Sequence, residues 1–489
     1  MFVLTMHSMT MDKARLIFIV LLTSVFYKVD ANISVWNGHS YSFDWYWTGS
    51  EGVYHIKTAA DLAGLSRCFS TGYYLHGNFA GQTIILDNDI DLAGHEWTPI
   101  GLVDTENKYY EFAGCFDGNN HTIKGMSITK HNNKNINIGL FGFNVTNTFS
   151  VKNLRVEGDI ILSEITGIRD GESSIYIGGL VGYTEAGVIE NCQTNVNISV
   201  TINVGKNSSF VCGGIVGYIG QSDAVDICKD CFSSGDISLY FSSGYHAKVG
   251  GIVGESYNPD AIISNCASHS NIRVVNAFDC EVGGIVGFAN FYKMENTLFS
   301  GNIILEDCYY GTGGGLWGSD WSSQPFFNNC LVTGRIRITS EFAKYSPFIA
   351  SASLGAKFYN CYYLEGIPNK RNYGIEMTET ELKSGEPLNG FDKSIWCFEK
   401  GVFPTLQLFR DIYTDARGVR MDNNPSPQIK IIDGKVIEVY NISSKTRIKV
   451  FNMNGEMIMS NSICSPTTIN LTSGLYIIKI GNQTFKVSL

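Results

Sequence analysis

A glycine-rich pentapeptide recurs along the middle of this chain. Its copies are Ile138–Gly142, Gly178–Gly182, Gly213–Gly217, Gly250–Gly254, Gly283–Gly287 and Gly314–Gly318, with a degraded copy expected at Pro347–Ser351. Successive copies begin about 31 to 40 residues apart, a spacing typical of solenoids and other repeat arrays. Because one short unit cannot bury its own apolar face, the repeat predicts a fold in which neighbouring units stack on each other.

A second signature follows each pentapeptide. It is an Asn or Asp that in most copies precedes a cysteine. The polar positions are Asn153, Asn191, Asp230, Asn265, Asn296, Asn329 and Asn360, and the cysteines are Cys192, Cys231, Cys266, Cys330 and Cys361. Stacked strands about 4.8 Å apart would place these residues in two columns, an asparagine ladder beside small, inward-facing thiols. Strict alternation puts neighbouring residues on opposite faces, so a turn must lie near the asparagine if both point inward.

Short Ile- and Val-rich runs complete each unit, for example at 271–275, and no unit holds ten residues with helical periodicity. The expected fold class is therefore all-β, a right-handed parallel β-helix with short capping helices. A propeller is disfavoured because its blades need about four strands and 40 or more residues each.

The cysteines are expected to remain free thiols. Cys231 with Cys266, and Cys330 with Cys361, would lie on adjacent coils, but stacked side chains point in the same direction and do not suit a disulfide. Cys228 and Cys231 form a lone CxxC pair. Without a second pair it does not predict a zinc or redox site.

The repeats resemble the GLUG motif of bacterial surface proteins. The resemblance rests on Gly-Gly-Ile-Val-Gly followed by Asn-Cys, and it extends upstream to Tyr54–Leu65 and Phe116–Ile123 and downstream to Phe403–Leu406. It covers roughly residues 50–406. It implies a surface protein that acts in adhesion or in the binding of host glycans or matrix proteins.

The ends of a solenoid expose unpaired strand edges and need caps. Thr58 with Asp61 predicts a short helix over 59–69, and Thr378 with Glu381 predicts a second helix that ends near Gly385 and helps to close the far end. We expect an N-terminal cap region over 32–135, the repeat β-helix with its C-terminal cap over 136–408, and a linker over 409–428.

The N-terminus predicts a secretory signal peptide over residues 1–31. Lys13 and Arg15 precede an apolar run over 16–26, and Val29 and Ala31 follow at cleavage-site positions. The run is too short to span a bilayer comfortably, and no second long apolar stretch follows. No transmembrane segment is therefore expected.

Residues 429–489 predict a small Ig-like β-sandwich of seven short strands. Val450–Met457, Ile469–Ile480 and Phe485–Val487 resemble a type A C-terminal sorting domain of the type IX secretion system. This family usually has a longer loop before its Gly-Val-Tyr, whereas Gly474-Leu475-Tyr476 is compact here. The resemblance implies export to the cell surface of a Gram-negative bacterium, with the type IX machinery as partner.

No catalytic constellation, metal site or cofactor site is predicted. HExxH, GxSxG and Walker motifs are missing, and Gly313–Gly318 fits GxGxxG without a following helix. The net charge of −10 argues against nucleic acid as a partner. Asp87, Asp89 and Asp91 alternate along one strand face and suit calcium, although solvated or turn-forming carboxylates are the commoner case.

An aromatic residue follows the pentapeptide in four copies. These residues are Phe143, Tyr183, Tyr218 and Phe288, and Glu255 and Ser319 break the series. Exposed, the stripe would stack on sugar rings; buried, it would be a packing stack at a turn, which is commoner. Two alternatives to adhesion stay open: a carbohydrate-active enzyme (a polysaccharide lyase or glycosidase) on the β-helix, and a structural surface protein without a specific ligand.

Overall fold

The structure is a computed structural model. It describes residues 33–70, 77–103, 109–130, 136–165, 174–202, 209–220, 226–242, 246–259, 261–290, 293–320, 324–340, 342–352, 355–369, 372–410, 428–432, 436–440, 446–452, 457–463, 467–471, 474–480 and 483–488. The predicted signal peptide (1–31) and nearly all of the predicted linker lie outside these ranges. The chain divides into two compact units, 1–410 and 411–489.

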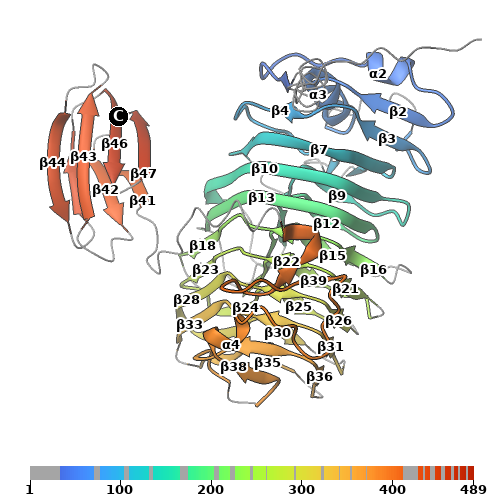
Figure 1. Ribbon diagram of the computed structural model, residues 1–489. Helices are drawn as coiled ribbons and strands as arrows, with labels where there is room; N and C mark the ends of the chain where they lie inside the picture. Colours follow the sequence, from blue (N-terminus) through green and yellow to red (C-terminus); the bar gives the residue numbers. More distant parts are fainter. Residues whose placement is uncertain are drawn as a thin grey trace, which may run out of the picture. The chain divides into compact units, whose positions relative to one another are not determined.

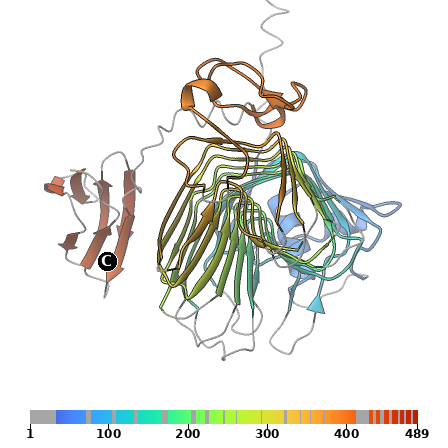
Figure 2. The same ribbon diagram turned by 90° about the horizontal axis from the view of Figure 1, so that it is seen from below.

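The first unit is a parallel β-solenoid of about eight turns (Figure 1), which confirms the predicted fold class. Most of its strands belong to three long parallel sheets, and viewed along the stack the coils lie over one another (Figure 2). The strands β5 (Leu102–Val103) and β6 (Tyr109–Tyr110) form a separate antiparallel pair. Sheet 1 has 22 strands, and sheets 2 and 3 have seven each. A typical coil contributes three short strands to sheet 1, then one strand to sheet 2 and one to sheet 3.

Sheet 1 starts with the N-terminal coils and ends with the last one. Its strands are β1 (Ser34–Val35), β2 (Val53–Ile56), β3 (Thr83–Leu86), β4 (Ile90–Asp91), β7 (Cys115–Ile128), β10 (Ser150–Ile165), β13 (Val188–Ile202), β16 (Asp226–Lys229), β17 (Phe232–Ser233), β18 (Ile237–Phe241), β21 (Ile262–Ser264), β22 (Ala267–Ser268), β23 (Ile272–Val275), β26 (Lys293–Glu295), β27 (Leu298–Phe299), β28 (Asn302–Cys308), β31 (Phe326–Asn328), β32 (Leu331–Val332), β33 (Arg335–Ser340), β36 (Lys357–Tyr359), β37 (Tyr362–Leu364) and β38 (Ile375–Met377).

In each coil the glycine-rich pentapeptide connects a strand of sheet 2 to the following strand of sheet 3. Sheet 2 holds β8 (Ile136–Ile138), β11 (Ile175–Gly178), β14 (Ser209–Gly213), β19 (His246–Gly250), β24 (Asp279–Gly283), β29 (Tyr310–Gly314) and β34 (Lys344–Ser346). Sheet 3 holds β9 (Phe141–Asn144), β12 (Val181–Thr184), β15 (Val216–Ile219), β20 (Val253–Ser256), β25 (Val286–Ala289), β30 (Trp317–Asp320) and β35 (Ile349–Ser351). The degraded copy at Pro347–Ser351 thus forms a seventh turn between the same two sheets.

Close backbone approach explains the three glycines of the pentapeptide. A methyl group on Gly250 would lie 1.9 Å from the Val253 carbonyl oxygen, and one on Gly251 would lie 2.1 Å from the Gly284 carbonyl oxygen of the next coil. A methyl group on Gly254 would lie 2.6 Å from the carbonyl oxygen of Gly217 in the preceding coil. The turn is therefore tight within one coil and tight against both neighbours, and a side chain larger than hydrogen does not fit.

The recurrent asparagine occupies a left-handed corner. Asn153, Asn191, Asp230, Asn265, Asn296, Asn329 and Asn360 all have φ between 47° and 54°. Asn and Asp tolerate this backbone region better than other non-glycine residues. This corner is the turn that was predicted near the asparagine. It interrupts the strand, for example between Ser264 and the buried Cys266, so the strict alternation of faces does not hold there.

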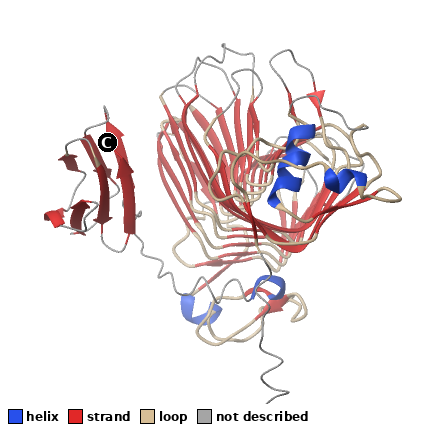
Figure 3. Cartoon of the chain, turned by 90° about the horizontal axis from the view of Figure 1, so that it is seen from above, coloured by secondary structure: helices blue, strands red, loops and turns tan. Residues whose placement is uncertain are grey.

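The N-terminal cap forms as predicted at α3 (Ala59–Cys68), and Thr58 and Asp61 make a full capping box. Leu62 and Leu65 of this helix are completely buried. A short helix that the sequence analysis missed, α2 (Asp44–Trp47), buries Trp45 beside Phe79. Viewed from the N-terminal end, both helices lie across part of the coil (Figure 3).

The predicted C-terminal helix is α4 (Glu379–Leu382), with Thr378 and Glu381 in a capping box. The chain then runs through β39 (Trp396–Cys397), β40 (Thr405–Leu406) and a 3₁₀ turn, Gln407–Phe409. This segment lies beside the coils rather than across their end (Figure 2), and the ring of Phe409 packs 5.2 Å from that of Phe232 in β17. Aromatic packing on the flank of the solenoid holds it there.

The second unit has two antiparallel sheets. One holds β41 (Gln428–Ile432), β42 (Val436–Tyr440) and β45 (Thr467–Asn470), and the other holds β43 (Thr446–Asn452), β44 (Met457–Ile463), β46 (Leu475–Ile480) and β47 (Gln483–Ser488). Val439 and Ile469 of the first sheet share one buried cluster with Ile448, Val450 and Ile478 of the second. The sequence also predicts turns at Asp433-Gly434, Asn454-Gly455 and Gly481-Asn482, and these lie outside the described residues.

Candidate functional site

The asparagine column forms a hydrogen-bonded ladder along the corner of sheet 1. The Nδ2 of Asn191 donates to Oδ1 of Asn153 at 2.8 Å, and Asn265 donates to Asp230 at 2.9 Å. Asn296, Asn329 and Asn360 continue the series at 3.0, 3.4 and 3.1 Å. Each amide is therefore occupied by its neighbours, which gives the column a structural role and leaves it poorly placed to bind a ligand.

The cysteine column lies directly behind the ladder. Cys192, Cys231, Cys266, Cys330 and Cys361 are free thiols and are buried. The Sγ atoms of Cys192, Cys231 and Cys266 lie 3.2 to 3.3 Å from backbone carbonyl oxygens two residues earlier, as weak S–H donors. These small groups fill the inside of the corner.

The aromatic column runs along sheet 3, where Phe143, Tyr183 and Tyr218 stack in register. Their ring centroids are 5.2 and 4.7 Å apart and nearly parallel. Phe143 and Phe288 are buried, and Tyr183 and Tyr218 are half-buried. Burial raises the pKa of both tyrosines. This geometry matches the packing-stack interpretation more closely than an open sugar-binding stripe.

A charged cluster continues this column where Glu255 replaces the aromatic residue. Glu255 is almost completely buried and pairs with Lys248 of sheet 2, whose ammonium lies 4.3 Å from the ring centroid of Phe288. Glu281 follows Lys248 in register on sheet 2. Burial raises the pKa of Glu281 to about 7, Asp279 and Glu255 add to that rise, and Lys248 opposes it. A carboxyl poised near neutrality is a feature of many acid–base sites.

The feature that the sequence analysis missed is an exposed aromatic patch formed by Phe278, Tyr309, Tyr310 and Phe342. These side chains are 43%, 40%, 42% and 47% exposed. They lie at the corner between sheets 1 and 2 on three successive coils. A signal was present, because Phe278, Tyr309 and Phe342 recur about 31 to 33 residues apart, just before the strands of sheet 2.

The patch is closely packed on a fixed backbone. Phe278 and Tyr309 stack at 5.4 Å with an angle of 10°, and Tyr310 lies 5.4 Å from Phe342. The backbone N–H of Tyr310 donates to the carbonyl of Phe278 at 2.8 Å, which holds neighbouring coils in register. His246 and Asp279, 3.5 Å apart, border the rings. The result is a rigid apolar surface with hydrogen-bonding groups at its edge.

The three alternating aspartates do not converge on a common point. Asp87 bonds to His55 at 2.8 Å, Asp89 to His121 at 3.0 Å, and Asp91 to Lys124 at 3.3 Å. Each carboxylate is thus occupied by a separate cation or imidazole of sheet 1. This pairing favours the solvated, structural interpretation over calcium.

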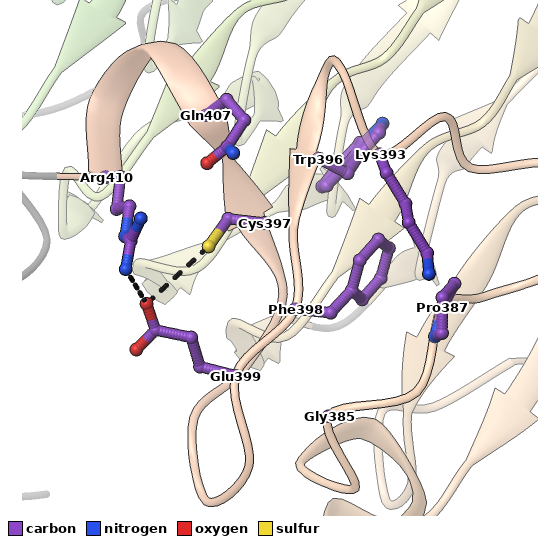
Figure 4. Close-up of a pocket in the computed structure, with 9 residues that line it drawn as sticks. All are labelled: Gly385, Pro387, Lys393, Trp396, Cys397, Phe398, Glu399, Gln407 and Arg410. Carbon is purple, nitrogen blue, oxygen red and sulfur yellow. Dashed lines mark hydrogen bonds and ion pairs between the residues drawn. The ribbon is translucent and has the colours of Figure 1, made fainter.

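A small pocket of about 280 Å³ lies in the flank segment after α4 (Figure 4). Trp396, Phe398 and Lys393 line one side, and Arg410 and Glu399 form an ion pair of 2.7 Å on the other. The Sγ of Cys397 lies 3.7 Å from the same Glu399 carboxylate. Arg410 and Glu399 therefore neutralise each other.

None of the helices in the described part of the chain has the length and hydrophobicity that a membrane span requires.

A family model described as the GLUG motif matches residues 173–201, which include β11, β12 and most of β13. Among solved structures, the chain is similar to one described as a "putative immunoglobulin A1 protease from Bacteroides ovatus", with 18% identity and a TM-score of 0.40, covering 74% of this chain and 94% of that one. No curated protein matches significantly. From the sheet geometry and the motif together, the chain is a β-helical repeat protein that carries the GLUG motif.

Proposed function

We propose that this protein is a glycan-binding adhesin of the bacterial cell surface, and that the aromatic patch is its binding surface. The exposure of four large rings on adjacent coils carries the proposal, because exposed apolar patches of this kind commonly mark interaction sites. The C–H-rich faces of pyranose rings pack on the electron-rich faces of aromatic rings.

The surroundings of the patch suit a sugar better than an apolar protein surface. Asp279, paired with His246, supplies a carboxylate acceptor at its edge. Lys344 is exposed on the coil that carries Phe342. Sugar hydroxyls need such groups around a stacking platform to fix orientation. The repeat also places equivalent rings one coil apart, which suits a chain of linked sugars.

The test is binding of the full chain to a glycan array, followed by titration of the best ligand. Tyr309→Ala and Phe278→Ala each remove one exposed ring and should weaken binding about fivefold, which corresponds to roughly 1 kcal/mol per stacked ring. Tyr359→Ala is the matched control, since Tyr359 is 53% exposed but lies on β36, away from the patch. Binding that is unchanged in both patch variants, or lost equally in the control, contradicts the proposal.

Export to the cell surface is part of the proposal. It is supported by the basic and apolar segment before Ala31 and by the resemblance of Ile469–Ile480 to a type IX sorting domain. Deleting residues 429–489 should leave the protein in the periplasm, whereas the full chain should be accessible to protease on intact cells. Equal surface exposure of both forms would remove this part of the proposal.

A second candidate function is a carbohydrate-active enzyme, and the cluster of Lys248, Glu255 and Glu281 favours it. A carboxyl whose pKa is raised to about 7 beside a lysine is suited to proton transfer to or from a sugar. The same glycans, incubated with wild type and with Glu281→Gln, distinguish this function. Cleavage by the wild type that is lost in the variant supports an enzyme, and intact glycan in both supports binding alone.

A further inference from the structure

Three cysteines meet at one corner of the solenoid. Cys228 lies in β16, Cys231 follows the left-handed corner at Asp230, and Cys266 is the equivalent of Cys231 on the next coil. Their three Sγ atoms lie within 4.8 Å of one another. All three side chains have no exposed surface.

Cys228 is what separates this corner from the other coils. In register with it stand Ile189 on one side and Ile263 on the other, so this column is otherwise apolar. The neighbouring column supplies stacked thiols at several levels, but a third thiol joins them here because the CxxC spacing bridges the corner. Within the described part of the chain, this is the group of three Cys, His, Asp or Glu side chains whose potential metal-binding atoms all lie within 4.8 Å of one another.

We propose that Cys228, Cys231 and Cys266 form a buried binding site for one copper(I) ion. Thiolates are soft ligands that select soft metal ions such as copper(I). With metal–sulfur bonds of about 2.3 Å, three sulfurs arranged as a triangle lie about 4 Å apart, so the thiols need move only slightly.

Zinc fits this corner less well. Structural zinc is held by four ligands, and the cluster offers three. The corner is also closed to solvent, so water does not readily supply the fourth position. Three-coordinate copper(I) needs no further ligand.

Each thiol that becomes a ligand releases its proton to solvent, and no electron is transferred because copper enters as copper(I).

Because the corner is closed, loading is expected during folding. The full chain is unfolded and refolded anaerobically with a copper(I)–acetonitrile complex, and weakly bound metal is then removed with a copper(I) chelator. Wild type should retain about one copper per chain, with three sulfur neighbours in X-ray absorption. Retention of no copper, or of copper with only two sulfur neighbours, overturns the proposal.

Two variants test whether these three cysteines bind the copper. Each introduces a residue of the kind that adjacent coils already carry at that position. Cys228→Val installs the kind of apolar residue that adjacent coils carry, and should lower retained copper at least tenfold. Cys330→Thr is the matched control: Cys330 belongs to the same stacked column, and Thr297 already occupies that column one coil earlier. It should retain copper as wild type does. Copper retained in Cys228→Val, or a Cys228–Cys231 disulfide in the anaerobic protein, overturns the site. Circular dichroism confirms that each variant is folded.

Discussion

Asn265 shows why one residue type recurs at the corner of each coil. Its backbone has a φ of 51°, its amide donates to Asp230 at 2.9 Å, and its carbonyl oxygen accepts from Asn296 at 3.0 Å. Glycine would satisfy the backbone and glutamine the hydrogen bonds, but asparagine does both. The residue identity therefore follows from two demands that coincide at one position.

Two substitutions at Asn265 test the left-handed backbone and the side-chain hydrogen bonds separately. Asn265→Ala should lower the free energy of unfolding by about 2–4 kcal/mol, since it loses two hydrogen bonds and strains a left-handed residue. Asn265→Gly keeps the backbone and should lose about half as much. Urea denaturation measures both. If the glycine variant is as stable as wild type, the ladder contributes nothing.

Glu281 links stability to pH. Its pKa is raised by burial to about 7, above its ordinary value of 4.5, so between these values the folded state holds a proton that the unfolded state has released. The stability from this group is fully present below pH 4.5 and is lost as pH rises through 7.

Glu281→Gln should therefore have a higher Tm than wild type at pH 8, and the difference should shrink toward pH 5. Differential scanning calorimetry at both pH values measures this. The control is Glu386→Gln at an exposed position, which should leave the pH dependence of Tm unchanged. A pH-independent difference at position 281 would contradict burial as the cause.

At the scale of the element, the pentapeptide turn couples each coil to the next. A methyl group on Gly284 would lie 2.2 Å from both the carbonyl oxygen of Gly315 and the ring of Phe299. Neither the backbone of the next coil nor a completely buried ring can easily move. This contact therefore determines how closely successive coils can stack within sheets 2 and 3.

Gly284→Ala should destabilise the solenoid by about 3 kcal/mol or more, as overpacked and strained core sites do. Gly220→Ala is the control, because the three atoms nearest to its methyl group, at 2.6 to 2.8 Å, would all belong to the carboxyl of Glu185, the far end of a flexible side chain. Thermal unfolding followed by circular dichroism compares them. Similar Tm values for the two variants would show that the turn can relax.

At the scale of the whole molecule, the chain consists of two units with separate cores. The second unit buries Val439, Ile448 and Ile478 in a cluster of its own. A chain that ends at Arg410 should therefore unfold with the same solenoid Tm as the full chain, within about 2 °C, since each unit has a hydrophobic core of its own. Calorimetry should show the loss of one transition. A solenoid Tm shift well above this would indicate that the units stabilise each other.

The repeat sequence was sufficient to predict the parallel solenoid, the columns and both capping boxes. Periodicity and caps are local signals, and stacking follows from them because one coil cannot bury its own apolar face. The path of the C-terminal segment was not predicted correctly, since it depends on Phe409 meeting Phe232, which is far away in sequence.

The candidate sites were likewise predictable from the sequence only in part. The sequence identified Phe143 and Tyr183 as one column, but whether a column is buried depends on how sheets 2 and 3 fold against each other. The spacing of the rings around Tyr309 and the CxxC pair at Cys228 were present in the sequence, but the exposure of the rings and the meeting of three thiols were decided only by the tertiary structure. Side chains of successive coils come within contact distance only when the register between coils is fixed, and that register is a property of the stack.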